Sequence, residues 1–303
     1  MSFRLIHGDA FKILPEFESN SFQAIVTDPP YGVREYSVVE LEKMRTRKGG
    51  IWRIPMRIGG YERNLLPRFT VLNEKDIQDL KTFFLAFGKE AYRVLVPGAH
   101  VITASTPLLS HHVIGSLISS GFEYRSTLVR VVRTFRGGDR PKGAEKEFKD
   151  ISVIPRGCWE PWLIFRKPIE GTVAQNLRKW KTGGLGRFSK DVPFMDLIKV
   201  EKTPKAEREI SGHPSVKPQE LMRLLVRCSL PLREGRVLDP FAGCGSTIAA
   251  SEHYGIESVG IEIDDEFYND AEKAIPKLAK LKLSSENEKS KHQTDILFSF
   301  EDA

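Results

Sequence analysis

Residues 237–247 have the sequence VLDPFAGCGST, which predicts a short apolar strand, a turn with two glycines and the start of a helix. Glycine lets the backbone approach a ligand closely, and a helix N-terminus offers unpaired N–H groups. Further along, residues 259–262 (VGIE) end a second strand with the carboxylate of Glu262, which can accept hydrogen bonds from both hydroxyls of a ribose. No lysine follows the glycines, so the turn favours a nucleoside with a zwitterionic tail over a triphosphate. A purely structural βαβ unit is the alternative.

Segments with strand-like and helix-like apolar spacing alternate along the whole chain. Strands are expected at residues 3–7, 22–27, 99–104, 127–132, 159–165, 236–238 and 257–263, and helices at 10–17, 74–95, 107–119, 219–230, 247–253 and 265–283. This alternation predicts an α/β fold with an open, mostly parallel sheet and helices on both faces. The strands at 127–132 and 159–165 are expected to form an antiparallel hairpin at one edge. Residues 1–283 are expected to form a single domain, with loop-like basic insertions at 33–70 and 172–210 and a polar tail at 284–303.

The sequence Asp28-Pro29-Pro30-Tyr31 directly follows a predicted buried strand. Two prolines stop a strand abruptly and shape the loop. The Asp28 carboxylate and the Pro29 carbonyl can both accept hydrogen bonds from one planar amine. That arrangement would favour a pyramidal nitrogen and aim its lone pair outward, while Tyr31 can stack on a base. A proline-rich turn without a function is the alternative.

Composition and charge narrow the class of protein. The chain has 303 residues, is 40% hydrophobic and carries a net charge of +6, with three cysteines that form no CxxC pair. These values predict a globular protein without a disulfide framework or a zinc ribbon, and they favour a polyanionic partner. No apolar run is long enough to span a bilayer and no signal core is present, so we expect a soluble, cytoplasmic protein.

Two motifs together resemble a known family. Asp28–Tyr31 and Asp239–Gly245 are similar to the catalytic and cofactor motifs of the S-adenosylmethionine-dependent DNA amino-methyltransferases, which methylate adenine N6 or cytosine N4. The catalytic motif comes first, as in the permuted β class, and His213–Pro218 and His7–Asp9 resemble further segments of that class. The resemblance covers residues 3–32, 75–168 and 210–275. Small residues replace the more usual Ser and Thr at Cys244 and Ser246, which preserves close backbone approach.

The resemblance implies a Rossmann-like methyltransferase sheet, S-adenosylmethionine as the cofactor and no metal. It assigns catalysis to Asp28 and Tyr31, with Pro29 and Pro30 completing the motif. Within the cofactor site it gives Glu262 the ribose, Asp9 the adenine amine and Lys217 the rim of the pocket. The full implied set of cofactor contacts is Asp9, Ala10, Lys217, Asp239, Phe241, Gly243, Gly245, Ser246, Thr247 and Glu262.

The expected activity is site-specific methylation of adenine N6 in duplex DNA, by base flipping and direct transfer. Aspartate as the first motif residue is more typical of family members that act on adenine, and cytosine N4 is the first alternative. RNA methyltransferases and a protein glutamine methyltransferase family share the catalytic motif, but their glycine motif comes first. A catalytically idle DNA-binding subunit is a further alternative.

Double-stranded DNA is the expected partner. Residues 33–70 hold nine Lys and Arg against four Asp and Glu, residues 172–210 hold nine against five, and both stretches contain aromatic residues. We expect them to wall a basic cleft facing the Asp28 loop, with phosphate contacts from Arg45, Arg47 and Lys48 and sequence readout by Arg178, Lys179 and Trp180. Solvated loops on the far face are the alternative. A homodimer and a cognate restriction endonuclease are left open as further partners.

Overall fold

The computed structural model describes residues 2–30, 57–58, 61–62, 74–132, 138–211, 213 and 216–283. Its main feature is an eight-stranded sheet in the order β1-β10-β9-β2-β5-β7-β6-β8. The strands are β1 (Phe3–His7), β2 (Phe22–Thr27), β5 (Leu95–Ala104), β6 (Glu123–Val131), β7 (Trp159–Arg166), β8 (Leu197–Lys199), β9 (Arg236–Asp239) and β10 (Glu257–Glu262). Only β7 runs antiparallel to its neighbours in this sheet. The mostly parallel sheet with a hairpin near one edge confirms the expected fold class.

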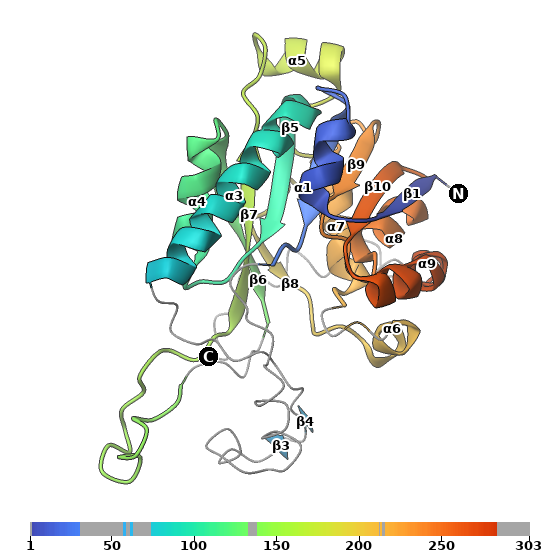
Figure 1. The fold of residues 1–303 in the computed structure, drawn as a ribbon. Helices are drawn as coiled ribbons and strands as arrows, with labels where there is room; N and C mark the ends of the chain where they lie inside the picture. The colour runs from blue at the N-terminus through green and yellow to red at the C-terminus, as the bar shows by residue number, and fades with distance from the viewer. Residues whose placement is uncertain are drawn as a thin grey trace.

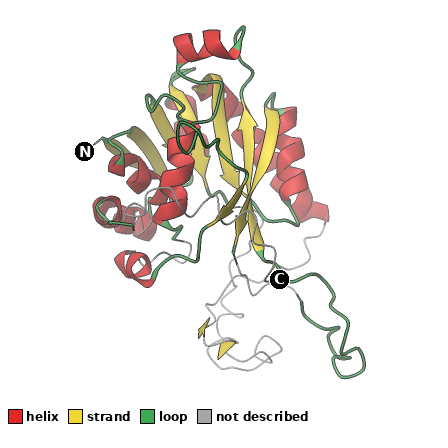
Figure 2. Ribbon diagram, turned by 180° about the vertical axis from the view of Figure 1, so that it is seen from behind, coloured by secondary structure: helices red, strands yellow, loops and turns green. Residues whose placement is uncertain are grey.

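Helices cover both faces of the sheet (Figures 1 and 2). One face carries α1 (Ala10–Ile13), the 3-10 helix η1 (Leu14–Glu16), α3 (Glu74–Val94) and α4 (Ser110–Ser119), and the other carries α7 (Gln219–Ser229), α8 (Ser246–His253) and α9 (Asp265–Ala279). Alternation along the strands builds the two cores, because successive side chains point to opposite faces. In β5, Val101 packs into the α3 core and Ile102 into the α7 core.

The junction of α3 and β5 differs from the sequence expectation. Pro97 and Gly98 were expected to separate the helix from a strand beginning at Ala99, but β5 begins at Leu95, directly after α3. Gly98 adopts a φ of 78°, and its N–H donates to the Lys167 carbonyl at 3.0 Å. The proline and glycine therefore lie inside the strand, where the glycine supplies a conformation that other residues rarely adopt.

Residues 170–212 contain more structure than their lack of periodicity predicts. They form α5 (Val173–Trp180), β8 and α6 (Lys205–Ile210). A capping box between Thr172 and Gln175 starts α5, and the buried Asn176 amide ties the helix to the Pro97 carbonyl at 3.0 Å. Each element is too short to show a clear period, and α5 is anchored by hydrogen bonds rather than by an apolar stripe.

Several predictions concern residues outside the described ranges. The polar tail at 284–303 lies there, as does most of 33–70, except for the antiparallel pair β3 (Arg57–Ile58) and β4 (Tyr61–Glu62). Within the described ranges, none of the helices has the length and apolar character needed to cross a membrane.

Candidate active site

Four acidic residues end or directly follow neighbouring strands, at the end of the sheet where these strands have their carboxyl termini. In strand order they are Asp9 after β1, Glu262 ending β10, Asp239 ending β9 and Asp28 after β2. The carboxyl ends of parallel strands lie at the same end of a sheet, and ligands of open α/β sheets bind just beyond them. The structure therefore brings together the strand-end carboxylates that the sequence singled out.

Asp239 is the most deeply buried of these acids, with 2% of its surface exposed. Its Oδ1 accepts hydrogen bonds from Thr27 Oγ1 at 2.7 Å and from the Phe241 N–H at 3.2 Å. Burial raises the pKa of Asp239 to about 6, against the opposing effect of its hydrogen bonds, and the nearby Asp28 charge adds to the rise. Buried acids with such shifts are concentrated at functional sites.

The glycine turn after β9 has the geometry that its sequence predicts. Gly243 and Gly245 have φ angles of 52° and 76°, and Gly245 caps α8. A Cβ on Gly245 would lie 2.4 Å from Ile275 Cγ1, so any other residue there would force the Ile275 side chain to shift. Thr247 Oγ1 donates to the Val26 carbonyl at 3.2 Å and ties the start of α8 to β2.

Glu262 connects the glycine turn to the next strand. Its Oε2 accepts the Gly243 N–H at 2.7 Å, and its Oε1 accepts the Asp264 N–H at 2.8 Å. Only 8% of Glu262 is exposed. Two backbone donors thus fix the orientation of the carboxylate, while each oxygen keeps a second lone pair for a ligand.

Asp9 lies near Phe241, since the ring of Phe11, two residues after Asp9, has its centroid 6.4 Å from that of Phe241. Asp9 caps α1 by accepting the Phe11 N–H at 2.9 Å, and Ala10 is the first, buried residue of that helix. The half-buried Phe241 ring packs against Phe83 and Phe87, with ring centroids 5.5 and 5.6 Å away. These contacts fix Phe241 as an apolar wall beside the glycine turn.

Asp28 is paired with a lysine. The half-buried Asp28 leads into the buried Pro29 and the exposed Pro30, while Tyr31 lies outside the described residues. Lys217 Nζ lies 2.7 Å from Asp28 Oδ2 and 3.1 Å from Glu160 Oε1. Lys217 therefore contacts Asp28 directly, a contact that the expected role at the cofactor rim did not include.

Sequence reasoning missed Glu160 and Arg130, which stand opposite each other on β7 and β6. Arg130 donates to Glu160 Oε2 at 2.9 Å, and Trp162 Nε1 donates to the same oxygen at 3.3 Å. Burial opposes ionisation of Glu160, but Lys217 and Arg130 outweigh it and lower its pKa to about 2. The sequence did offer one signal for these two residues. Each of the expected strands at 127–132 and 159–165 carries a single charged residue among mostly apolar ones.

Only part of the expected nucleic-acid contacts lies within the described residues. Arg45, Arg47 and Lys48 lie outside the described residues. Arg178, Lys179 and Trp180 belong to α5, which lies at the end of the sheet opposite Asp28 (Figure 1). The expectation that all of 172–210 faces the Asp28 loop is therefore wrong for α5, because its capping box and Asn176 anchor it to the start of β5.

The Lys179 and Trp180 side chains are also already engaged. Both donate to Glu170 Oε2, at 2.6 and 3.0 Å. Their role in sequence readout stays a prediction, without the proximity to Asp28 that motivated it.

A long loop between β6 and β7 projects from the edge of the sheet that carries Asp28 (Figure 1). Its described part, residues 138–158, is held by paired backbone bonds from Gly138 to Ile154 and from Val153 to Asp139. Phe148, Ile151 and Val153 are 43%, 53% and 65% exposed. Its basic residues are Arg140, Lys142, Lys146, Lys149 and Arg156.

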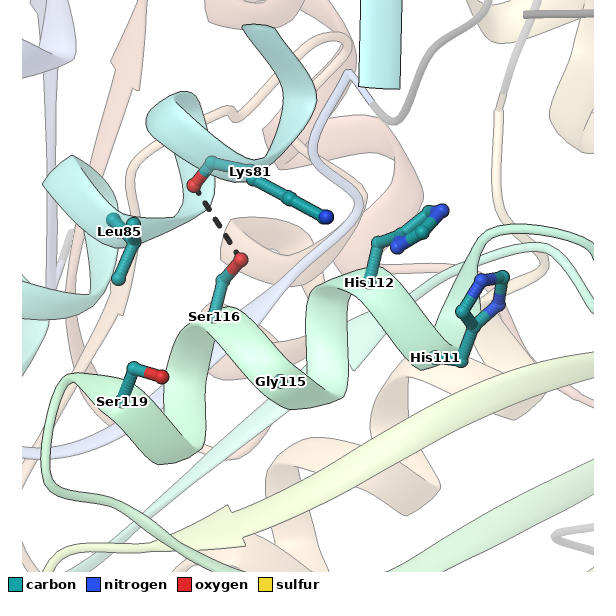
Figure 3. A pocket seen from close by; sticks show the side chains of 7 residues that line it. All are labelled: Lys81, Leu85, His111, His112, Gly115, Ser116 and Ser119. Atoms are coloured by element: carbon teal, nitrogen blue, oxygen red, sulfur yellow. Dashed lines mark hydrogen bonds between the residues drawn. The ribbon is translucent and has the colours of Figure 1, made fainter. Parts of the chain in front are cut away.

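A separate hollow lies on the outer surface between α3 and α4 (Figure 3). Lys81, His111 and His112 line one side of it, and Ser116 donates to the Lys81 carbonyl at 3.4 Å. Burial, with help from His111 and Lys81, lowers the pKa of His112. None of the strand-end carboxylates borders this hollow.

Comparison with known proteins identifies the family. The family model described as DNA methylase (N6_N4_Mtase) matches residues 22–273. The chain belongs to this DNA methylase family. The predicted resemblance is thereby confirmed, and the protein is a DNA amino-methyltransferase that acts on N6 or N4.

Individual relatives of this DNA methylase agree with the assignment. The chain is 25% identical over 288 residues to the Type II methyltransferase M.HindIII of Haemophilus influenzae, an alignment that covers 88% of this chain and 92% of that protein. Its fold resembles M1.HpyAVI in complex with SAM, with a TM-score of 0.55, 17% identity and coverage of 90% and 98%. It also resembles the cytosine-N4-specific PvuII DNA methyltransferase, with a TM-score of 0.57, 13% identity and coverage of 95% and 90%.

The family uses S-adenosylmethionine, and the carboxyl edge of this DNA methylase fits that cofactor. At Gly243 an added Cβ would lie 3.2 Å from His213 Nε2, so a side chain at this position would crowd His213. The oriented Glu262 carboxylate suits a diol, and the buried Asp239 suits a cationic group. The aromatic wall at Phe241 and the carboxylates of Glu262 and Asp239 together match a nucleoside with a positively charged tail.

Proposed function

We propose that this DNA methylase methylates the exocyclic N6 amine of adenine at a specific site in duplex DNA. One observation carries the proposal: Thr27, the residue before Asp28, donates to Asp239 at 2.7 Å. Through this bond the catalytic motif and the cofactor motif meet at adjacent strand ends. Holding donor and acceptor groups in one fixed geometry supplies much of the rate of a direct transfer.

We assign individual roles as the family resemblance implies. Glu262 accepts the ribose hydroxyls, Asp239 faces the charged tail, Phe241 forms the apolar wall and Asp9 accepts the adenine amine of the cofactor. Ala10, Gly243, Gly245, Ser246 and Thr247 supply close backbone and helix N-terminal contacts. When bound, S-adenosylmethionine supplies an electrophilic methyl group on a sulfonium sulfur.

The residues around Asp28 act on the target amine. The Asp28 carboxylate and the Pro29 carbonyl accept hydrogen bonds from the two N–H groups of the amine. These bonds direct the nitrogen lone pair out of the base plane. Tyr31 stacks on the base, which must leave the duplex to reach this edge. The reaction then needs neither a metal nor a covalent intermediate on the protein.

Duplex DNA is proposed to approach the edge of the sheet that carries Asp28. The β6–β7 loop supports this route because exposed apolar residues share one projecting segment with five basic residues, against four acidic ones, at 138–158. Proteins that distort or open a duplex often insert apolar side chains between base steps while cations neutralise phosphates. Contacts from Arg45, Arg47 and Lys48 stay part of this proposal.

Adenine is preferred over cytosine because the motif begins with aspartate, which is more typical of adenine-specific family members. Cytosine N4 is the competing substrate, since it also presents an amine to Asp28. Incubation of the protein with labelled S-adenosylmethionine and duplex DNA, RNA or protein, followed by nucleoside analysis, distinguishes the alternatives. The proposal expects label in N6-methyladenine of duplex DNA, whereas N4-methylcytosine or labelled RNA would refute the adenine–DNA assignment.

The biological setting is proposed from the relatives. M.HindIII is named a Type II methyltransferase, which supports a cognate restriction endonuclease as partner and action on cytoplasmic DNA. Co-expression with a candidate endonuclease tests this partner, because the methyltransferase should protect the host genome from cleavage. A homodimer stays a prediction, which sedimentation of the purified protein with and without DNA can measure.

A further inference from the structure

A mostly buried group of four charged side chains includes Asp28, the first residue of the proposed catalytic motif. Lys217 Nζ bridges Asp28 Oδ2 at 2.7 Å and Glu160 Oε1 at 3.1 Å. The side chains of Asp28, Lys217 and Glu160 are 22%, 14% and 16% exposed. The fourth member, Arg130, pairs with Glu160 at 2.9 Å and is 6% exposed.

Rigid elements hold this group. Glu160 and Arg130 are cross-strand partners on β7 and β6. Arg130 also donates to the Val200 carbonyl at 3.1 Å and to the Glu201 carbonyl at 2.6 Å. Glu160 therefore has little freedom, and it presents Oε1 to Lys217 from a fixed position.

Stability does not explain such an arrangement. Replacing a buried network of charges by apolar residues of similar volume is often neutral or stabilising, whereas removing one partner is costly. The Lys217 end of the network also contacts Asp28, the first residue of the motif that is proposed to receive the target base. Its geometry thus points to a role in the reaction.

An ammonium on one carboxylate oxygen restricts how the carboxylate can rotate. With Oδ2 of Asp28 held by Lys217, the direction of Oδ1 is set as well. A carboxylate whose orientation is already set needs less reorganisation in the transition state.

We propose that Lys217, anchored by Glu160 and Arg130, is a positioning residue that fixes and keeps ionised the Asp28 carboxylate for the target amine. This inference rests on the proposed function. Within the described part of the chain, charges face Asp28 from Lys217 in the segment before α7, from Glu160 on β7 and from Asp239 on β9. Replacing Lys217 by an uncharged residue removes the cation that lies 2.7 Å from Asp28 Oδ2.

Lys217→Met tests the proposal because it keeps the length of the side chain and removes the charge. We expect kcat to fall about tenfold or more, since misplaced reacting groups lose rate steeply. The loss in kcat should exceed any loss in affinity for S-adenosylmethionine, because the printed contacts of Lys217 are with Asp28 and Glu160. The acid limb of the kcat profile should move up by about one pH unit, as expected when a carboxylate loses an adjacent cation.

Two further variants separate positioning from a merely structural role. Lys217→Arg restores the cation and should return the acid limb toward the wild-type position. Glu160→Gln removes one of the acids facing Asp28, so it should lower kcat without moving the acid limb upward. Lys205→Met removes the cation of an exposed pair with Glu209 on α6 and is the matched control, expected to match wild type.

A readout independent of methylation keeps the two proposals distinguishable. Carboxyl-carbon NMR of the free protein, with Asp28 assigned from Asp28→Asn, should show the Asp28 titration at higher pH in Lys217→Met. If the wild type methylates no DNA but the Asp28 titration still shifts in Lys217→Met, the proposed function is refuted, whereas the effect of Lys217 on Asp28 is supported. An unchanged acid limb and an unchanged Asp28 titration in folded Lys217→Met would overturn the inference. If Lys217→Met does not fold, a Glu160→Gln protein with wild-type kcat would overturn it.

Discussion

Asp239→Asn should make the protein more stable at neutral pH while weakening cofactor binding. The buried Asp239 carboxyl has its pKa raised from 3.8 to about 6, mainly by burial. The folded protein therefore binds more protons than the unfolded chain between these values, and the free energy of unfolding falls as pH rises through this window. Asparagine keeps an oxygen that accepts from Thr27 and Phe241 but carries no charge.

The size of the effect follows from the shift. A difference of 2.2 pKa units corresponds to about 3 kcal/mol, because one unit is about 1.4 kcal/mol. Unfolding is practical to measure between pH 4.5 and pH 8. Over this range the free energy of unfolding of the wild type should fall by about 2 kcal/mol through Asp239, and that of the variant should not.

Urea unfolding of both proteins across this pH range measures the difference. The stability of Asp239→Asn relative to wild type should rise with pH and level off above pH 7. Asp150→Asn, at an exposed position, controls for the loss of one negative charge. A difference that is independent of pH, or a variant less stable than wild type at pH 8, would refute the reasoning.

Three further predictions address the cofactor, the turn and DNA. Glu262→Ala should weaken S-adenosylmethionine binding by about 1.5–3 kcal/mol, through loss of a charge-assisted bond, in calorimetry; an unchanged Kd would move the ribose site elsewhere. Gly245→Ala should destabilise the fold by about 2–5 kcal/mol in urea unfolding, because a left-handed residue and a contact at 2.4 Å with Ile275 add together. The companion change Ile275→Ala should make the double variant less unstable than the sum of the two single changes, and simple additivity would contradict this. Replacing Phe148, Ile151 and Val153 with serine should raise the DNA Kd about tenfold in fluorescence anisotropy without changing cofactor binding, as expected for an apolar wedge; equal DNA affinity would remove the β6–β7 loop from the interface.

The sheet and the strand-end acids could be predicted because they depend on local patterns. Asp28, Asp239 and Glu262 each follow an apolar segment, and parallel strands must end at one edge. The glycine turn could also be predicted, since positive φ at Gly243 and Gly245 excludes most other residues.

The network that includes Asp28 could not be predicted in the same way. Lys217, Glu160 and Arg130 come from three distant segments, and their meeting depends on the register between β6 and β7. The position of α5 was predicted wrongly because closeness in sequence to the cofactor segment was taken for closeness in space. A polar anchor, Asn176 on the Pro97 carbonyl, decides that position, and it leaves no periodic signal.

The most direct test of the central claim is a map of modified bases in the genome of a methylation-free host that expresses the protein. The account predicts N6-methyladenine at one recurring sequence with the wild type and none with Asp28→Ala, although the purified Asp28→Ala protein still binds S-adenosylmethionine. N6-methyladenine at wild-type levels in the Asp28→Ala strain, or N4-methylcytosine in the wild-type strain, would contradict it.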